Sequence, residues 1–198
     1  MRYDLRWEIL GATISGTLIL TACSQPGANA PNTAQPPTYS CQAQAATGEA
    51  YTHAQTPAEP FTVSIPKLPD WKPAATARTD NKLSVVKTIG ISRSLTMLMS
   101  LDPTSTSQQA TEQLKDLTKF DSSVAIVEDE TVDVCGLEAS RLVGITEDRG
   151  LRFEYLNLAY PFDGNYYPLQ LRGQMAICDF PLFGVEVETM FRHLQIGP

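Results

Sequence analysis

The feature that most constrains this sequence is a series of four strand-like segments between Val124 and Ile177, separated only by short turns. In order along the chain they read VAIVEDETVDV, LEASRLVGI, LRFEYLNLAY and YYPLQLRGQMAI. Runs of this kind, rich in β-branched and aromatic residues, are typical of strands. The breaks at Cys135-Gly136, Glu147–Gly150 and Asp163-Gly164-Asn165 have hairpin length. Consecutive segments must therefore pair antiparallel and build a sheet.

Three further strands and a helix are expected before this series. The strands are FTVSIP (61–66), KLSVVKTI (82–89) and SLTMLMSLD (94–102), the last with a clear period of two. A helix is expected over 107–119, because Thr106 and Gln109 have the spacing of a capping box. Its buried stripe would consist of Ala110, Leu114 and Leu117.

A second helix is expected at the end of the chain, over 180–193. Asp179 would be its N-cap, and Pro181 lies in its first turn. The apolar residues that should pack on the sheet are Phe183, Val187, Phe191 and Leu194. The order of strands, helix, strands and helix, with hairpin-length connections, predicts the α+β class: an antiparallel sheet with helices packed on it.

The N-terminus has the pattern of an export signal. Residues 9–20 (ILGATISGTLIL) are uncharged and mostly apolar, too short to span a bilayer but suited to the core of a signal peptide. The following Leu20-Thr21-Ala22-Cys23 resembles the lipobox of bacterial lipoproteins. We therefore expect a signal peptide over 1–22, cleavage between Ala22 and Cys23, and a diacylglyceryl group on Cys23. An ordinary N-terminal helix or a simple secretory signal is the alternative.

The segment after the signal is expected to be a tether. Residues 24–60 contain six of the 14 prolines and nine alanines, with Glu49 and Glu59 as the only charged side chains. Such a composition cannot build a core. We therefore divide the chain into a signal peptide (1–22), a lipid anchor and Pro/Ala-rich tether (23–60), and a globular α+β domain (61–198).

Several short motifs together resemble the LpqN-type family of actinobacterial lipoproteins. They are the lipobox LTAC, the FTVSIPKLPDW entry, the Gly-x-x-Ala step in CGLEAS, the YYPLQL strand and the closing helix with its LQIGP tail. The resemblance implies a PsbP-like α-β-α sandwich in a family largely without known catalysis, whose members act through partners in the cell envelope. The cysteines at positions 41, 135 and 178 depart from the family pattern.

With Cys23 assigned to lipid, three cysteines remain, and an exported protein meets an oxidising environment. Cys135 precedes strand 138–145, and Cys178 follows strand 166–177, which runs parallel to it two strands away. The two cysteines would then lie about 25–30 Å apart, against about 5.5 Å between the Cα atoms of a disulfide. We predict a Cys41–Cys178 disulfide, with Cys135 as the alternative partner of Cys41; three unpaired thiols are the other possibility.

Charge and motif content narrow the function classes. The formal charge is −7, and no basic run exists, which argues against nucleic-acid binding. The sequence has no Gly-x-Ser-x-Gly, no nucleotide-binding glycine motif and only two histidines, so we predict no catalytic, cofactor or metal site. The acidic run Glu128–Glu130 with Asp133 could offer oxygens to Ca²⁺, but it lacks calcium-loop spacing and fits a solvated hairpin edge better.

The hairpin over 151–177 offers a candidate docking face. Its hydrophobic pattern places Phe153, Tyr155, Leu169, Leu171 and Met175 on one side. The other side would carry Arg152, Glu154, Gln170, Arg172 and Gln174. This polar face would either dock a partner or simply be solvated, as polar faces of antiparallel sheets often are.

These observations lead to a main hypothesis with alternatives. The first is a non-catalytic binding module for a protein partner, anchored by Cys23 on the extracytoplasmic side of the cell membrane. The second is a carrier for a lipid or another apolar ligand. Its cavity would be lined by Leu95, Met97, Met99, Met175 and Met190. An envelope hydrolase that uses Glu or Asp as acid and base is a third possibility, because paired carboxylates leave no motif.

Overall fold

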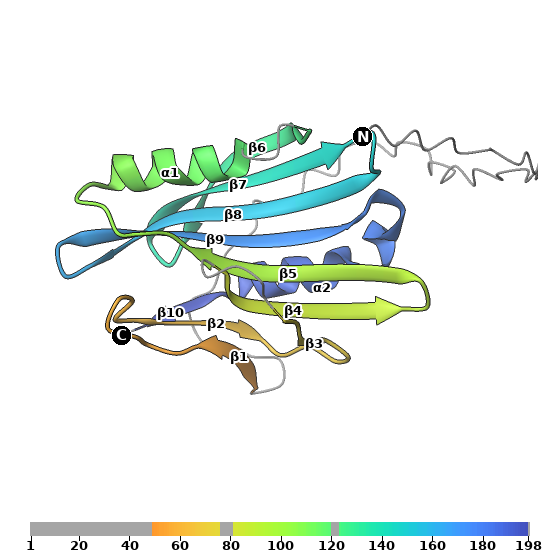
Figure 1. Cartoon of the computed structure of the whole chain (residues 1–198), viewed down its shortest axis with the longest axis horizontal. Coiled ribbons are helices and arrows are strands. Elements are labelled where there is room, and N and C mark those ends of the chain that lie inside the picture. The colour runs from red at the N-terminus through yellow and green to blue at the C-terminus, as the bar shows by residue number, and fades with distance from the viewer. Residues whose placement is uncertain (1–48, 76–80, 120–122, 198) are drawn as a thin grey trace, which may run out of the picture. The chain divides into compact units, whose positions relative to one another are not determined.

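The computed structural model describes residues 49–75, 81–119 and 123–197. This part of the chain forms a seven-stranded sheet, in the order β3-β4-β5-β9-β8-β7-β6, and a three-stranded sheet, in the order β1-β2-β10 (Figure 1). The elements are β1 (Ala50–His53), β2 (Thr62–Pro66), β3 (Lys72–Pro73), β4 (Asn81–Ile89), β5 (Ser92–Ser100), α1 (Ser107–Lys119), β6 (Ala125–Val134), β7 (Leu137–Thr146), β8 (Leu151–Phe162), β9 (Asn165–Ala176), the 3₁₀ turn η1 (Ile177–Asp179), α2 (Phe180–Arg192) and β10 (Gln195–Gly197). All strand pairs of both sheets are antiparallel, so the expected α+β class is confirmed.

Helices pack on both faces of the large sheet, in the expected α-β-α layering. Helix α2 and the small sheet cover one face, which we call the α2 face, and α1 covers part of the other, the α1 face (Figure 1). The four apolar residues expected to pack on the sheet, from Phe183 to Leu194, are all buried. Helix α2 comes close to the sheet at Gly173, where a Cβ atom would lie 2.6 Å from Cγ1 of Val187. The missing side chain therefore sets the spacing between helix and sheet.

The folded part of the chain begins earlier than the predicted boundary between residues 60 and 61. Strand β1 lies within the predicted tether and pairs with β2 from Ala50 opposite Pro66 to His53 opposite Val63. The hydroxyl of Tyr51 donates a hydrogen bond to the carbonyl of Trp71, which ties β1 to the domain. The Pro/Ala-rich composition hides this strand because β1 has only four residues. The predicted signal peptide and residues 23–48 of the predicted tether lie outside the described residues.

The helix starts differ from one another. At α1 the expected cap forms, and the backbone N–H of Gln109 donates to Oγ1 of Thr106 over 3.2 Å. At α2, Asp179 is the N-cap residue as expected, but its side chain makes no capping bond and accepts a hydrogen bond from the hydroxyl of Ser92 instead. On the buried side of α1, Thr118 takes the position expected for Leu117.

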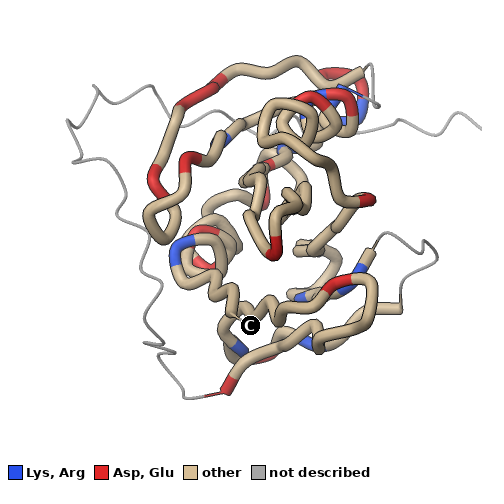
Figure 2. The backbone as a smooth tube through the Cα atoms, turned by 90° about the vertical axis from the view of Figure 1, so that its left-hand side faces the viewer, with Lys and Arg blue, Asp and Glu red and all other residues tan. Residues whose placement is uncertain are grey.

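In the end-on view of Figure 2, positions of Lys and Arg are interspersed with positions of Asp and Glu along the backbone of the described residues. The acidic residues 128–130 lie on β6, the edge strand of the large sheet, as the solvated-edge interpretation requires. Neither of the helices in the described residues is long and apolar enough to cross a membrane.

Candidate functional site

The pairing of β8 with β9 decides which side chains share a face, and it overturns the predicted docking face. Phe153 lies opposite Gln174, and Tyr155 lies opposite Arg172. Directly opposed residues of antiparallel strands point to the same side. The predicted docking face is therefore divided between the two faces. Arg152 and Glu154 belong to the α2 face, whereas Gln170, Arg172 and Gln174 belong to the α1 face together with Phe153 and Tyr155.

The turn between these strands explains the error. Phe162 pairs with Asn165, so the loop consists of Asp163 and Gly164 alone. Both have positive φ, 46° and 77°, as the two-residue type I′ turn of a hairpin requires. With this loop, an odd-numbered residue always faces an even-numbered partner. The hydrophobic pattern had instead grouped odd with odd, because buried charges were not foreseen.

Gln170 is not available for docking, because it belongs to a buried polar cluster beneath α1. Its amide donates to Oγ1 of Thr118 over 3.1 Å and to Oδ1 of Asn157 over 2.9 Å. Thr118 also donates to the carbonyl of Leu114 within its own helix. The three polar side chains are buried, and their mutual hydrogen bonds offset the cost of removing them from water. This cluster fixes α1 on β8 and β9.

The rest of the α1 face forms a partly exposed surface. The guanidinium of Arg172 lies over the ring of Phe153, 4.5 Å from its centroid, and 5.7 Å from that of Tyr155. On the neighbouring strand β5, Met97 lies opposite Arg172 and Leu95 opposite Gln174. We call the partly exposed residues Val86, Leu95, Met97, Arg172 and Gln174 the open sheet surface.

A pocket of about 410 Å³ lies at one end of the open sheet surface. It is lined by Ile91, Arg93, Leu95, Leu151, Gln174, Met175, Ala176 and Asp179. The predicted carrier cavity does not form as one space. Leu95, Met97 and Met99 lie on the α1 face, whereas Met175 lies on the α2 face and Met190 is buried in α2.

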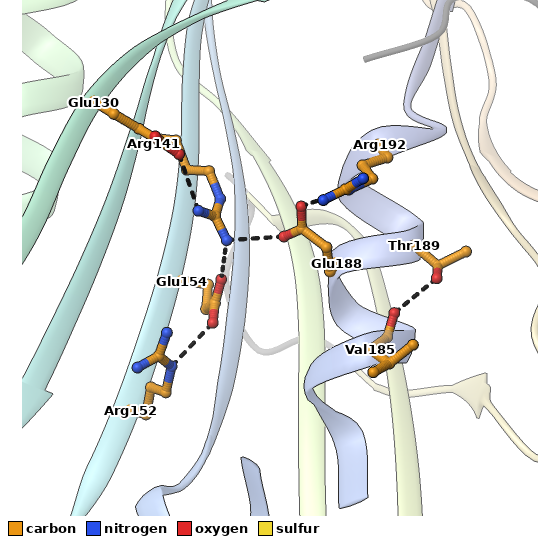
Figure 3. Close-up of polar contacts among 8 residues, drawn as sticks. All are labelled: Glu130, Arg141, Arg152, Glu154, Val185, Glu188, Thr189 and Arg192. Atoms are coloured by element: carbon orange, nitrogen blue, oxygen red, sulfur yellow. Dashed lines mark hydrogen bonds and ion pairs between the residues drawn. The ribbon is translucent and has the colours of Figure 1, made fainter. Parts of the chain in front are cut away.

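The two charged residues assigned to the α2 face are part of an ion-pair network (Figure 3). Arg141 of β7 donates to Glu130 of β6 over 3.0 Å, to Glu154 of β8 over 3.1 Å and to Glu188 of α2 over 2.8 Å. Two further pairs complete it, Arg152 with Glu154 at 2.9 Å and Arg192 with Glu188 at 2.7 Å. Three carboxylates thus balance three guanidinium groups. The network holds α2 to the outer strands.

A second carboxylate of α2 makes contacts on the opposite side of the helix. Glu186 accepts a hydrogen bond from the indole N–H of Trp71 over 2.9 Å and pairs with Lys87 of β4 at 2.7 Å. Trp71 is buried in the main core. Helix α2 is therefore fixed by polar contacts along both of its edges as well as by its apolar face.

A third polar cluster joins β1 to the large sheet. Glu59 is buried, and its carboxylate contacts His53 at 2.7 Å and Lys82 at 3.3 Å. Burial raises the pKa of Glu59, but the Ser100 hydroxyl, His53 and the charge of Lys82 outweigh it and hold the pKa below its usual value. Ser100 faces the carboxylate without ideal hydrogen-bond geometry. The cluster is a structural link whose strength depends on pH.

Several large apolar side chains are exposed at one end of the domain. They are Ile89 and Ile91 at the β4–β5 turn, Ile177 in η1, and Phe180, Leu182 and Val185 in α2. Each exposes at least 38 % of its surface. We call these six residues the apolar end. The hydrophobic pattern could not indicate them, because an apolar residue in a sequence is normally assigned to the core.

The other predicted site residues are not tested by the structure. Cys23 and Cys41 lie outside the described residues, so lipidation and the disulfide stay predictions. The strands do place Cys135 in the β6–β7 turn and Cys178 in η1, at opposite ends of the sheet. In the part of the chain that is described, no three His, Cys, Asp or Glu residues are grouped so that they could hold a metal ion.

Fold and surface together define a small α+β domain with an antiparallel sheet between two helices. No family model matches the sequence, and no curated protein is similar to it at a significant level. Among solved structures, the fold is similar to the crystal structure of LpqN involved in cell envelope biogenesis of Mycobacterium tuberculosis. The TM-score is 0.54 at 15 % sequence identity, and the alignment covers 82 % of this chain and 99 % of that chain. The resemblance expected from the sequence is thus confirmed at the level of the fold.

Proposed function

We propose that this protein is a lipid-anchored component of a bacterial cell envelope that binds a protein partner and catalyses no reaction. The observation that carries the proposal is the similarity to LpqN over nearly the whole length of that chain. LpqN is described as involved in cell envelope biogenesis. The Leu-Thr-Ala-Cys pattern that ends at Cys23 supports export and anchoring on the outer side of the membrane.

The open sheet surface is our candidate for the partner-binding site. Arg, Met and aromatic residues are enriched at protein interfaces. Here Arg172 is held over two aromatic rings beside Met97. A side chain that is already stacked loses little conformational entropy when a partner covers it. The surface also lies between the buried cluster under α1 and the β4–β5 turn, so rigid elements support it.

A site-specific crosslink tests this proposal. A photo-reactive amino acid at position 97 should give a discrete crosslinked product in intact envelopes, and the additional change Arg172→Ala should reduce that product several-fold. The matched control carries the same group at Lys115, which is exposed on α1. Equal products from positions 97 and 115, or a product at 97 that does not depend on Arg172, would contradict the proposed surface.

A carrier role for an apolar ligand is the second candidate, and the pocket beside Leu95 and Leu151 favours it. Its volume of about 410 Å³ falls within the range of small-molecule sites, about 300–1,000 Å³. Native mass spectrometry of the protein purified in mild detergent should then detect a bound lipid. Leu95→Glu should abolish that adduct. Protein that carries no adduct would exclude the carrier role.

A further inference from the structure

The apolar end is built from three segments that are held together. Asp179 of η1 accepts a hydrogen bond of 2.8 Å from Ser92, which follows the β4–β5 turn. The N–H of Ile177 donates to the carbonyl of Gly150 in the β7–β8 turn over 2.8 Å. Both turns and the start of α2 lie at the same end of the large sheet (Figure 1). The exposed side chains are thus presented by a fixed framework rather than by a loose loop.

Within α2, the exposed apolar side chains are confined to the start of the helix. Leu182 and Val185 occupy solvent-facing positions in the first two turns, where a surface helix normally carries polar residues. Further along the same side, Thr189 and Arg192 are polar, and Thr189 bonds back to the carbonyl of Val185 (Figure 3). The helix therefore changes from apolar to polar with distance from the β4–β5 turn.

Six exposed apolar side chains at one end of the domain cannot be explained by a contribution to the stability of the fold. Ile91, at the tip of the turn, is fully exposed, so it contributes nothing to the core. Grouped exposed apolar residues mark interaction sites in soluble domains. Ile89 and Ile91 each border a pocket, whereas Leu182 and Val185 project from the helix start and line neither of these pockets. Such protruding groups suit a lipid surface, which accepts them without a complementary shape.

The position at which the described chain begins favours a membrane as the binding partner of the apolar end. The described chain begins at Glu49, which pairs with Lys67 after β2. Three residues further on, Asp70 lines a pocket together with Ile89 of the apolar end. As a random coil, the 25 residues of the predicted tether between Cys23 and Glu49 would span about 25–30 Å. A lipid group on Cys23 would therefore keep this side of the domain close to the bilayer.

Arginine side chains next to the apolar residues also fit a lipid bilayer as the binding partner. Arg152 lies over the ring of Phe180, 4.2 Å from its centroid, and Arg93 is exposed beside Ile91. Long cationic side chains at the border of an apolar surface can reach lipid phosphates. The formal charge of −7 argues against attraction to anionic lipid as the main force, so the apolar residues must carry the contact.

We infer that the apolar end is a second membrane contact, which rests on the bilayer beside the Cys23 anchor and gives the domain a fixed orientation. This inference rests on the proposed function, because the tether supplies the proximity. A contact of six apolar side chains is too small to hold a free protein on a membrane, but it becomes populated when an anchor raises the local concentration. The lipid anchor would keep the protein on the membrane, and the apolar end would set the orientation of the domain.

Tryptophan quenching tests the inference on the full lipidated chain, purified from membranes and reconstituted in phosphatidylcholine vesicles. Ile91→Trp and Leu182→Trp should be quenched several-fold more strongly by brominated acyl chains than the parent chain, in which Trp71 is the tryptophan that remains after cleavage before Cys23. The matched control is Asn165→Trp at the start of β9, at the opposite end of the sheet, whose quenching should not exceed that of the parent. Adding Val185→Glu to Leu182→Trp should reduce the quenching while circular dichroism stays unchanged.

The outcomes separate the inference from the proposed function. Protein that floats with the vesicles but shows no more quenching at position 91 than at 165 would overturn the inference and leave the anchor in place. A dimer in detergent that Val185→Glu dissociates would overturn it too, and would assign the surface to a second copy. A parent chain that does not float with the vesicles would refute the anchor itself, and the inference with it.

Discussion

Two glutamates contact the same guanidinium at nearly equal distance but differ in burial, which allows the ion-pair network to be tested sharply. Glu154 and Glu130 lie 3.1 Å and 3.0 Å from Arg141. The side chain of Glu154 is only 3 % exposed, whereas that of Glu130 is 44 % exposed. Glu154 also accepts from Arg152. Replacing either by glutamine keeps the shape and removes the charge.

The expected magnitudes follow from this difference in burial. Removing one partner of a fully buried ion pair costs about 3–5 kcal/mol. The side chains of Arg141 and Arg152, which pair with Glu154, are 16 % and 20 % exposed, so water can partly replace the lost carboxylate. We therefore expect Glu154→Gln to lower the free energy of unfolding by about 2–3 kcal/mol, close to one charge-assisted hydrogen bond. Glu130→Gln should cost about 0–1 kcal/mol, as exposed pairs do.

Urea unfolding followed by the fluorescence of buried Trp71 measures both values, in a Cys23→Ser background that excludes the predicted lipid attachment. A double-mutant cycle with Arg141→Met should show strong coupling to Glu154 and little to Glu130. Added salt should remove the remaining effect of Glu130→Gln but not that of Glu154→Gln. Equal costs for the two glutamine variants would refute the reasoning from burial.

Three further predictions concern the packing, the pH response and the cysteines. Gly173→Ala should lower the free energy of unfolding in urea by about 1–3 kcal/mol, because its Cβ would overlap Val187. Val187→Ala in the same chain should cancel most of that clash. If the losses caused by the two substitutions simply added, the close approach of helix and sheet would be contradicted. The pKa of Glu59 is lowered in the fold, so its contribution to stability is complete above the ordinary value of 4.5 and is lost as the pH falls through the lowered pKa. The loss of thermal stability caused by Glu59→Gln should therefore become smaller on acidification. A loss that stays constant with pH would be inconsistent with this assignment. Peptide mapping without reduction should find Cys41 in a disulfide with Cys178 or Cys135, and a Cys41 thiol open to alkylation would disprove it.

The hairpin series was predictable because its signals are local. Strand-forming residues alternate with short turns, and the observed bounds of β6 to β9 agree closely with the predicted segments. The same holds for α1, whose cap at Thr106 is a contact between residues three positions apart. Where neighbours in the sequence determine a structure, the sequence alone is enough to predict it.

The candidate site was less predictable because it depends on pairing between distant residues. Glu154 has the polarity of a surface residue, but Arg141 and Glu188, from other elements, allow it to be buried. Counting apolar residues could not reveal these partners and therefore gave the wrong face for β8. The two-residue turn at Asp163-Gly164 was the available signal, since it fixes the register without reference to polarity.

The two proposed surfaces together restrict how the protein could work. Strands β4 and β9 run towards the apolar end, and β5 and β8 run away from it (Figure 1). If that end rests on lipid, the strands rise from the bilayer, and the open sheet surface faces sideways. A partner bound there would most simply be a neighbour in the same membrane. Lengthening the tether should then leave crosslinking from position 97 intact, whereas Ile91→Glu with Val185→Glu should weaken it by releasing the orientation. If the crosslink from position 97 changed with the length of the tether and not with the two glutamate substitutions, the apolar end would have no part in partner binding.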